Sequence, residues 1–232
     1  MNNLKDIKIM ILTDSVGNPR SFPAEDAVSV EESYPYLLRD EFKNAVFWQL
    51  SYGGMEAQDI INSAIGYLND WKPDIIIVQL GIIDCRTEAL SEFQKLIITK
   101  FSGPFFKFIK KHLYNPKLIK NRKLTRVSKS KFKKVITKLS MVFEHSKILW
   151  LEISINPAYE NARPGTIKRV ANYNKIILDA LDNELVLVQN ILLDNNGFNS
   201  DNLHVNKIGH ILIAKELKFS IDNYIHSNFE KK

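Results

Sequence analysis

Short apolar runs alternate along the chain with longer segments in which apolar residues recur at helical spacing. The short runs have the length and β-branched content of buried strands and cover Ile7–Leu12, Val46–Leu50, Asp74–Leu80, Lys147–Ile153 and Leu185–Val188. The helical patterns cover about Tyr34–Phe42, Glu56–Leu68, Lys131–Glu144, Pro164–Leu181 and Asn206–Ile225. Repeated strand–helix units with almost continuously apolar strands predict an α/β fold, in which helices cover both faces of a mostly parallel five-stranded sheet.

Length and composition predict one domain spanning residues 1–232. The chain has 232 residues, of which 45% are hydrophobic, enough for a single substantial core. The first predicted strand begins at Ile7, which leaves no room for a secretory signal, and no apolar run is long enough to span a membrane. The single Cys85 excludes an intrachain disulfide. We therefore expect a cytoplasmic protein.

A serine near the N-terminus and an Asp–His pair near the C-terminus have the chemistry of acyl transfer. Ser15 closely follows the first predicted strand, where open α/β sheets place their ligands. Asp201 precedes His204 by three residues, so its carboxylate can hold one ring nitrogen while the other takes a proton from a serine hydroxyl. A lone Asp-Ser pair would indicate only a polar turn. Together with Asp201 and His204, it favours a nucleophilic serine.

Four short blocks, in order along almost the whole chain, resemble those of the SGNH/GDSL hydrolases, a family of serine esterases with a flavodoxin-like three-layer α/β/α fold. The blocks are Thr13-Asp14-Ser15 for Gly-Asp-Ser, Gly53-Gly54 for the oxyanion glycine, Gly81-Ile82-Ile83-Asp84 for Gly-x-Asn-Asp, and Asp201-Asn202-Leu203-His204 for Asp-x-x-His. The resemblance implies a triad of Ser15, His204 and Asp201, with no cofactor and no metal. It also implies that the backbone N–H groups of Ser15 and Gly54 bind the oxyanion.

Two positions depart from the family pattern. Thr13 replaces the first glycine, a change that the turn can accommodate. Ile83 replaces the asparagine whose amide would be the third oxyanion donor, and isoleucine cannot donate a hydrogen bond. Loss of one such donor typically costs about 100- to 1,000-fold in rate. Either Asn18 or Arg86 substitutes, or the enzyme is slow or inactive; the predicted oxyanion and substrate-binding group is Gly54, Asn18, Asp84 and Arg86.

The formal net charge of +6 arises from one segment. Between Lys95 and Lys138 lie fifteen Lys or Arg residues and no Asp or Glu, which leaves 17 basic and 26 acidic residues elsewhere. The segment overlaps a predicted insertion at about residues 92–130, between the third and fourth strands. Its part Phe101–Tyr114 mixes aromatic residues with lysines and has two interpretations, an interfacial membrane helix or a lid packed on the domain.

This charge favours peripheral contact with an anionic surface. Anionic lipid head groups would attract Lys95–Lys138 at about 1 kcal/mol per basic residue, which would place the protein at the inner face of the membrane. A charged glycan is an alternative partner. Nucleic acid is a disfavoured partner because the sequence has no recognisable nucleic-acid-binding motif beside the basic segment.

The other polar residues near these motifs have structural interpretations. Asp14 is expected to accept backbone hydrogen bonds that shape the turn, as the family resemblance implies. Packing roles are predicted for Cys85 and for His210 on the last helix. His112, His145 and His226 have no partner at metal-ligand spacing, so a zinc site is not expected.

The motifs favour a serine-dependent ester hydrolase. The Gly-Ile-Ile-Asp-Cys variant with a basic insertion resembles SGNH-type proteins associated with bacterial surface-polysaccharide synthesis, which implies an acetylated or otherwise acylated sugar as substrate. Two alternatives stay open. One is an O-acyltransferase acting on a polysaccharide intermediate, because a sugar hydroxyl can take the place of water. The other is a catalytically impaired member that binds a glycan or lipid. The residues indicate neither the acyl group nor the oligomeric state.

Overall fold

Five parallel strands form the central sheet of the computed structural model, which describes residues 7–63, 67–102, 115–181 and 185–228. The strands are β1 (Lys8–Thr13), β2 (Val46–Ser51), β3 (Ile75–Gln79), β4 (Lys147–Leu151) and β5 (Leu185–Val186), in the order β2-β1-β3-β4-β5. Because every pairing is parallel, all five strands end at the same edge of the sheet. The five predicted strands are confirmed, although β4 and β5 end earlier than predicted.

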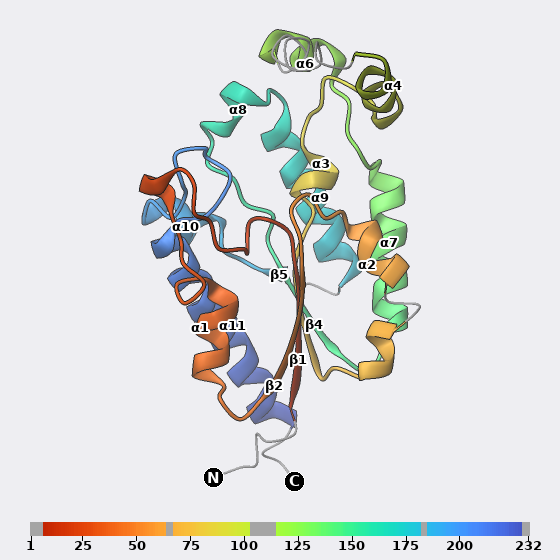
Figure 1. Cartoon of the computed structure of the whole chain (residues 1–232). Helices are drawn as coiled ribbons and strands as arrows, with labels where there is room; N and C mark the ends of the chain where they lie inside the picture. Colours follow the sequence, from red (N-terminus) through yellow and green to blue (C-terminus); the bar gives the residue numbers. More distant parts are fainter. Residues whose placement is uncertain (1–6, 64–66, 103–114, 182–184, 229–232) are drawn as a thin grey trace.

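Helices cover both faces of this sheet (Figure 1). On one face α1 (Tyr34–Glu41) packs against α11 (Lys207–Asn228), which also contacts α10 (Gln189–Asp194). On the other face α7 (Lys129–Val142) lies between α2 (Ala57–Ser63) and α9 (Thr166–Ala180). The predicted three-layer α/β/α class is confirmed. Shorter helical segments are η2 (Ala24–Asp26), η4 (Asn69–Trp71), α3 (Ile82–Cys85) and α8 (Tyr159–Ala162).

The position of each strand follows from its side chains. All five residues of β3 are buried, as are those of β1 from Ile9 onward. A strand that is apolar on both faces is stable only in the middle of a covered parallel sheet, and both strands lie there. In β2 every side chain is at least partly exposed, and this strand forms an edge.

The crossover helix α7 shows why the helices dock on the sheet. Its buried residues Phe132, Val135, Ile136 and Leu139 recur at the spacing of one helical face. Phe132 meets Trp150 of β4 with ring centroids 6.2 Å apart. The indole N–H of Trp150 donates to the carbonyl of Leu80 at 3.1 Å, so the polar atom of this buried ring is satisfied.

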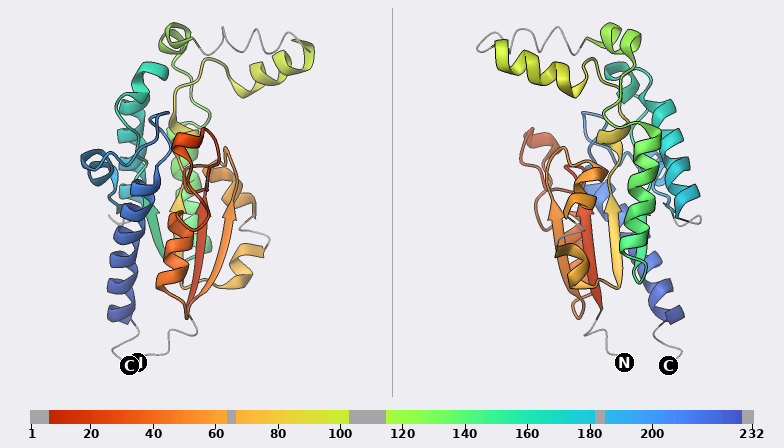
Figure 2. Two further views of the ribbon diagram at one scale, coloured as in Figure 1. Left: turned by 60° about the vertical axis from the view of Figure 1, so that its left-hand side comes forward. Right: turned by 90° about the vertical axis from the view of Figure 1, so that its right-hand side faces the viewer.

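Two helices stand beyond the carboxyl ends of the strands, apart from the helices that cover the sheet (Figures 1 and 2). They are α4 (Glu92–Ser102) and α6 (Pro116–Arg122), and both belong to the segment predicted as an insertion. The stretch Phe101–Tyr114, predicted as an interfacial helix or a lid, lies almost wholly outside the described residues. In the described part of the chain, no helix has both the length and the apolar character needed to cross a membrane.

Candidate active site

Two loops at the carboxyl edge of the sheet bring Ser15 and His204 together. Ser15 follows the end of β1, and His204 lies in the loop that leads into α11. The hydroxyl oxygen of Ser15 is 3.0 Å from Nε2 of His204, across 189 residues of sequence. This is hydrogen-bonding distance between a hydroxyl and an imidazole nitrogen, so the structure makes the contact that the sequence predicts.

Asp201 holds the other side of the same ring. Its Oδ2 lies 2.6 Å from Nδ1 of His204, while Oδ1 accepts from the backbone N–H groups of Leu203 and His204 at 3.0 and 2.9 Å. Partial burial acts to raise the pKa of the Asp201 carboxyl, but the hydrogen bonds from His204 and Leu203 outweigh it and hold the pKa well below its usual value. An ionised Asp201 selects the tautomer in which Nδ1 carries the proton and Nε2 is free to accept one.

The turn that presents Ser15 is built by its neighbours. Asp14 is buried, and its Oδ1 accepts from the backbone N–H of Val16 at 2.8 Å, as predicted. The hydroxyl of Thr13 donates to the side-chain oxygen of Gln79 at 3.0 Å, so this buried hydroxyl has a hydrogen-bond partner inside the protein. A Cβ at Gly17 would lie 2.3 Å from the Thr13 hydroxyl oxygen, so only glycine fits beside it.

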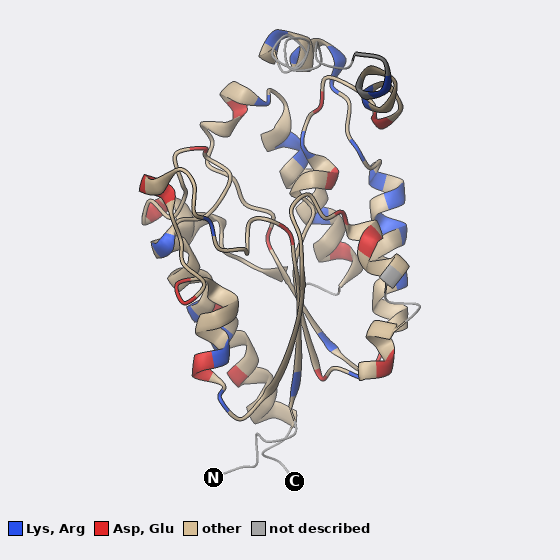
Figure 3. Cartoon of the chain, in the orientation of Figure 1, with Lys and Arg blue, Asp and Glu red and all other residues tan. Residues whose placement is uncertain are grey.

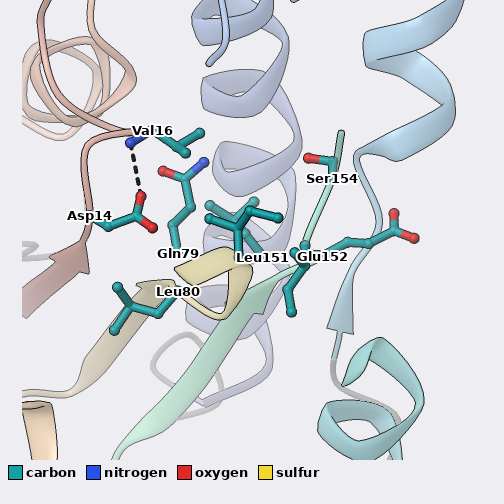
Figure 4. A pocket seen from close by; sticks show the side chains of 9 residues that line it. Asp14, Val16, Gln79, Leu80, Leu151, Glu152 and Ser154 are labelled. Carbon is teal, nitrogen blue, oxygen red and sulfur yellow. Dashed lines mark hydrogen bonds between the residues drawn. The ribbon is translucent and has the colours of Figure 1, made fainter. Parts of the chain in front are cut away.

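A small cavity lies behind this turn, at the ends of β1, β3 and β4 (Figure 4). Its volume is about 20 Å³, and its lining includes Asp14, Gln79 and Ser154. This is room for one water molecule and not for a substrate. Oδ2 of Asp14 has no hydrogen-bond partner among the described residues, and burial raises the pKa of this carboxyl to about 6.

The predicted oxyanion loop lies beside Ser15. A Cβ built at Gly53 would be 4.0 Å from the Cβ of Ser15, and Gly54 has a φ of 80°, a conformation that favours glycine. Asn18 lies one turn after the serine, where its backbone N–H contacts the carbonyl of Ser15 at 3.4 Å. The side-chain amide oxygen of Asn18 accepts a hydrogen bond from the Ser51 hydroxyl. The NH2 group of the Asn18 side chain therefore points away from Ser51.

Ile83 and Asp84 are both buried. Ile83, at the position of the family asparagine, is only 4% exposed. Both carboxylate oxygens of Asp84 lie 3.3 Å from the backbone N–H of Ala57, at the start of α2. Burial raises the pKa of Asp84 to about 7. The side chain therefore faces the protein interior and ties α3 to the loop that carries Gly54.

Arg86 is engaged in a cluster around a buried carboxylate. Glu88 is 1% exposed, and its oxygens lie 2.8 Å from Arg86, 2.9 Å from Arg163 and 3.6 Å from Lys95. Burial acts to raise the pKa of Glu88, but the three cations outweigh it and lower the pKa. Nε of Arg86 is therefore held by this buried anion, whereas Asn18 lies in the turn after Ser15.

Arg20 is a site residue that sequence reasoning missed. Its guanidinium lies 3.0 Å from Oδ2 of Asp201, the oxygen that also holds His204. The backbone of Arg20 pairs with that of Val28 through two hydrogen bonds of 2.8 Å, and Asp26 accepts from the N–H of Ser200. The loop after β1 thus fixes the loop that carries the Asp–His pair. No local pattern marks this contact, because 181 residues separate the partners.

The other singled-out residues are structural. His210 accepts from the backbone N–H of Tyr34 at 3.2 Å and stacks on its ring, and burial lowers the pKa of His210 to about 4. Cys85 is buried, which raises the pKa of its thiol. Both predicted packing roles are confirmed. His112 lies outside the described residues, and in the described ranges no cluster of His, Cys, Asp or Glu is arranged to hold a metal ion.

The strand order and the two helical layers give the chain the three-layer α/β/α fold seen in SGNH/GDSL hydrolase structures, as predicted. A lipase/acylhydrolase from Enterococcus faecalis superposes with a TM-score of 0.64 at 13% identity, covering 94% of this chain and 96% of that one. An acetylxylan esterase from Geobacillus stearothermophilus gives 0.61 at 14% identity, with 93% and 94% covered.

A psychrotrophic esterase from Pseudoalteromonas, inhibited by monoethylphosphonate, gives a TM-score of 0.55 at 18% identity, covering 94% of this chain and 98% of that one. Neither a protein-family model nor a curated protein sequence matches the chain. At these identities the likeness to solved structures shows a common fold.

Proposed function

We propose that this protein is a serine-dependent ester hydrolase. The observation that carries the proposal is the continuous chain of contacts from the Ser15 hydroxyl through His204 to Asp201, with distances of 3.0 and 2.6 Å. A nucleophile, a base and a group that orients the base are the parts that acyl transfer requires. The structural neighbours support it, since they are a lipase/acylhydrolase and esterases, and catalytic mutants of the acetylxylan esterase replace a serine and a histidine.

The roles of the residues follow from ester chemistry. Ser15 Oγ attacks the carbonyl carbon while Nε2 of His204 takes the hydroxyl proton, and Asp201 stabilises the imidazolium that forms. His204 then gives this proton to the departing alcohol, which leaves an acyl group on Ser15. A water molecule, deprotonated by His204, adds to the acyl carbon and releases the carboxylic acid and the free Ser15 hydroxyl. Arg20 acts as a positioning residue by holding Asp201.

The oxyanion is assigned to three donors in this proposal. The backbone N–H groups of Ser15 and Gly54 supply two, and the side-chain NH2 of Asn18 supplies the third in place of the asparagine that Ile83 replaces. Two observations support Asn18: it lies in the turn after Ser15, and its amide oxygen is held by Ser51. A donor held in place before the reaction stabilises developing charge most effectively.

The favoured substrate is a sugar that carries a short-chain acyl ester, such as an acetyl ester. The acetylxylan esterase neighbour supports this class, as does the family variant that the motifs resemble. Purified protein should release p-nitrophenol from p-nitrophenyl acetate, and added xylo-oligosaccharides should leave the acetic acid yield unchanged. Acetylated sugar as the main product, detected by mass spectrometry, would instead indicate an O-acyltransferase. Failure both to release p-nitrophenol and to deacetylate an acetylated oligosaccharide would contradict the proposal and leave the catalytically impaired glycan- or lipid-binding alternative.

Asn18→Ala should lower kcat for p-nitrophenyl acetate by about 10- to 1,000-fold with little change in KM, because the lost donor acts mainly on the developing negative charge. Asn18→Asp is the matched variant. It retains an oxygen for the Ser51 hydroxyl but replaces the NH2 group with a second oxygen, so it should be at least as slow as Asn18→Ala. Normal turnover in Asn18→Asp would show that Asn18 only supports Ser51. Steady-state kinetics of both variants decide between these roles.

A further inference from the structure

A groove of about 490 Å³ lies between helix α9 and the segment that runs from the end of α6 into α7. Among the described residues, its charged lining consists of Lys123, Lys129, Lys168 and Arg169, with no Asp or Glu. Figure 3 shows basic residues gathered along the chain that leads into α7. The groove shares no lining residue with the Ser15–His204 site.

The walls of the groove are held in place by hydrogen bonds. The Arg169 guanidinium donates to the carbonyl of Lys123, and the hydroxyl of Tyr173 donates to the carbonyl of Val127. The backbone N–H of Val127 donates to the carbonyl of Asp84 at 3.2 Å. The segment that carries two of the lysines is thus anchored to both α9 and α3. A groove whose shape is fixed before binding loses little conformational freedom when a ligand enters.

No carboxylate among the described residues neutralises the positive charge of the groove. Lys123, Lys129 and Lys168 are exposed, and none of the four cations has a carboxylate partner in the parts of the chain that the structure describes. The Glu88 cluster is a contrast, since its cations surround a buried carboxylate. Like charges lining one groove repel each other and raise the local concentration of anions.

We propose that this groove binds a ligand through one or more phosphate groups. Arginine and lysine are the side chains that recognise phosphate oxygens. The Ser128 hydroxyl accepts from the N–H of Lys131 at 3.3 Å, which leaves its own hydrogen for a ligand oxygen. The volume lies within the range of about 300–1,000 Å³ typical of small-molecule sites. It suits a phosphorylated molecule of nucleotide or sugar-phosphate size better than a single phosphate ion.

The test is titration of the full chain with inorganic pyrophosphate by isothermal calorimetry at low ionic strength. We expect saturable binding at one site. The double variant Lys129→Glu/Lys168→Glu should weaken it at least tenfold. The matched control is Lys133→Glu/Lys138→Glu, which makes the same charge change at exposed positions of α7 outside this groove. Melting followed by circular dichroism verifies that both variants are folded, and Lys129→Gln/Lys168→Gln should show a smaller loss of binding.

A second arm separates a soluble ligand from a lipid head group. Sedimentation with vesicles of phosphatidic acid in phosphatidylcholine is compared with the same vesicles without phosphatidic acid. Binding of pyrophosphate supports a soluble phosphate ester, and binding to phosphatidic acid vesicles alone supports a head group, provided that only the groove variant loses it. Equal losses in the groove and control variants, or no binding in either arm, would overturn the proposal.

Discussion

Replacing Ser15 with alanine is expected to lower kcat for p-nitrophenyl acetate by about 10⁶-fold, the size of effect seen when the nucleophile of a serine hydrolase is removed. The variant keeps the fold, because the change removes one oxygen from a half-buried side chain. Its only described side-chain hydrogen bond is the one to His204. The oxyanion donors remain, so a small rate above that in water should persist.

Covalent labelling distinguishes loss of the nucleophile from loss of binding. A fluorophosphonate probe should attach to the wild-type protein at one site, which mass spectrometry of a peptide containing Ser15 would locate. The Ser15→Ala variant should not be labelled. The control is Ser220→Ala on α11, where the serine hydroxyl donates to the carbonyl of Glu216; this variant should still be labelled at Ser15. Labelling that survives Ser15→Ala would contradict the assignment of the nucleophile.

His204→Ala is expected to lower kcat by a similar factor of about 10⁶, because a serine without its base is a weak nucleophile. Asp201→Asn should cost less, about 10⁴-fold, since the amide favours the tautomer in which Nε2 carries the proton and cannot accept another. Added imidazole should restore part of the activity of His204→Ala and none of that of Ser15→Ala. Steady-state kinetics with and without imidazole measure this difference.

The buried His210 provides the matched control for this prediction. It is the nearest histidine in sequence, but its Nδ1 is held by the backbone N–H of Tyr34. His210→Gln should therefore change thermal stability more than turnover. If His204→Ala kept near-normal turnover and His210→Gln lost it, the assignment of the base would be wrong.

The contacts around Asp201 keep its carboxylate ionised and oriented toward His204. One oxygen of Asp201 accepts from two backbone N–H groups, and the other contacts both His204 and Arg20. Partial burial acts to raise the pKa of this carboxyl, but the hydrogen bonds from His204 and Leu203 outweigh it and keep the pKa low. The Asp201 side chain is 38% exposed, so solvent screens these contacts and several of them are needed to hold its orientation.

The sequence by itself determined the elements and the order of the site blocks. The strand β3 is apolar from Ile75 to Val78, and α7 repeats apolar residues at the spacing of one helical face, so local composition specifies both element types. Parallel strands separated by helices then place all carboxyl ends at one edge. From this rule Ser15, at the end of β1, and the Asp201–His204 pair could be expected to meet.

Tertiary structure alone decided the contacts made by long side chains between distant segments. The pairing of Arg20 with Asp201, the enclosure of Glu88 by Arg86 and Arg163, and the groove that joins Lys129 to Lys168 depend on how loops fold back on one another. Such contacts produce no repeating pattern in the sequence. Each charged residue could pair with many residues of opposite charge, and only the path of the backbone decides which pair forms. The choice of Asn18 over Arg86 as oxyanion donor rests on this placement.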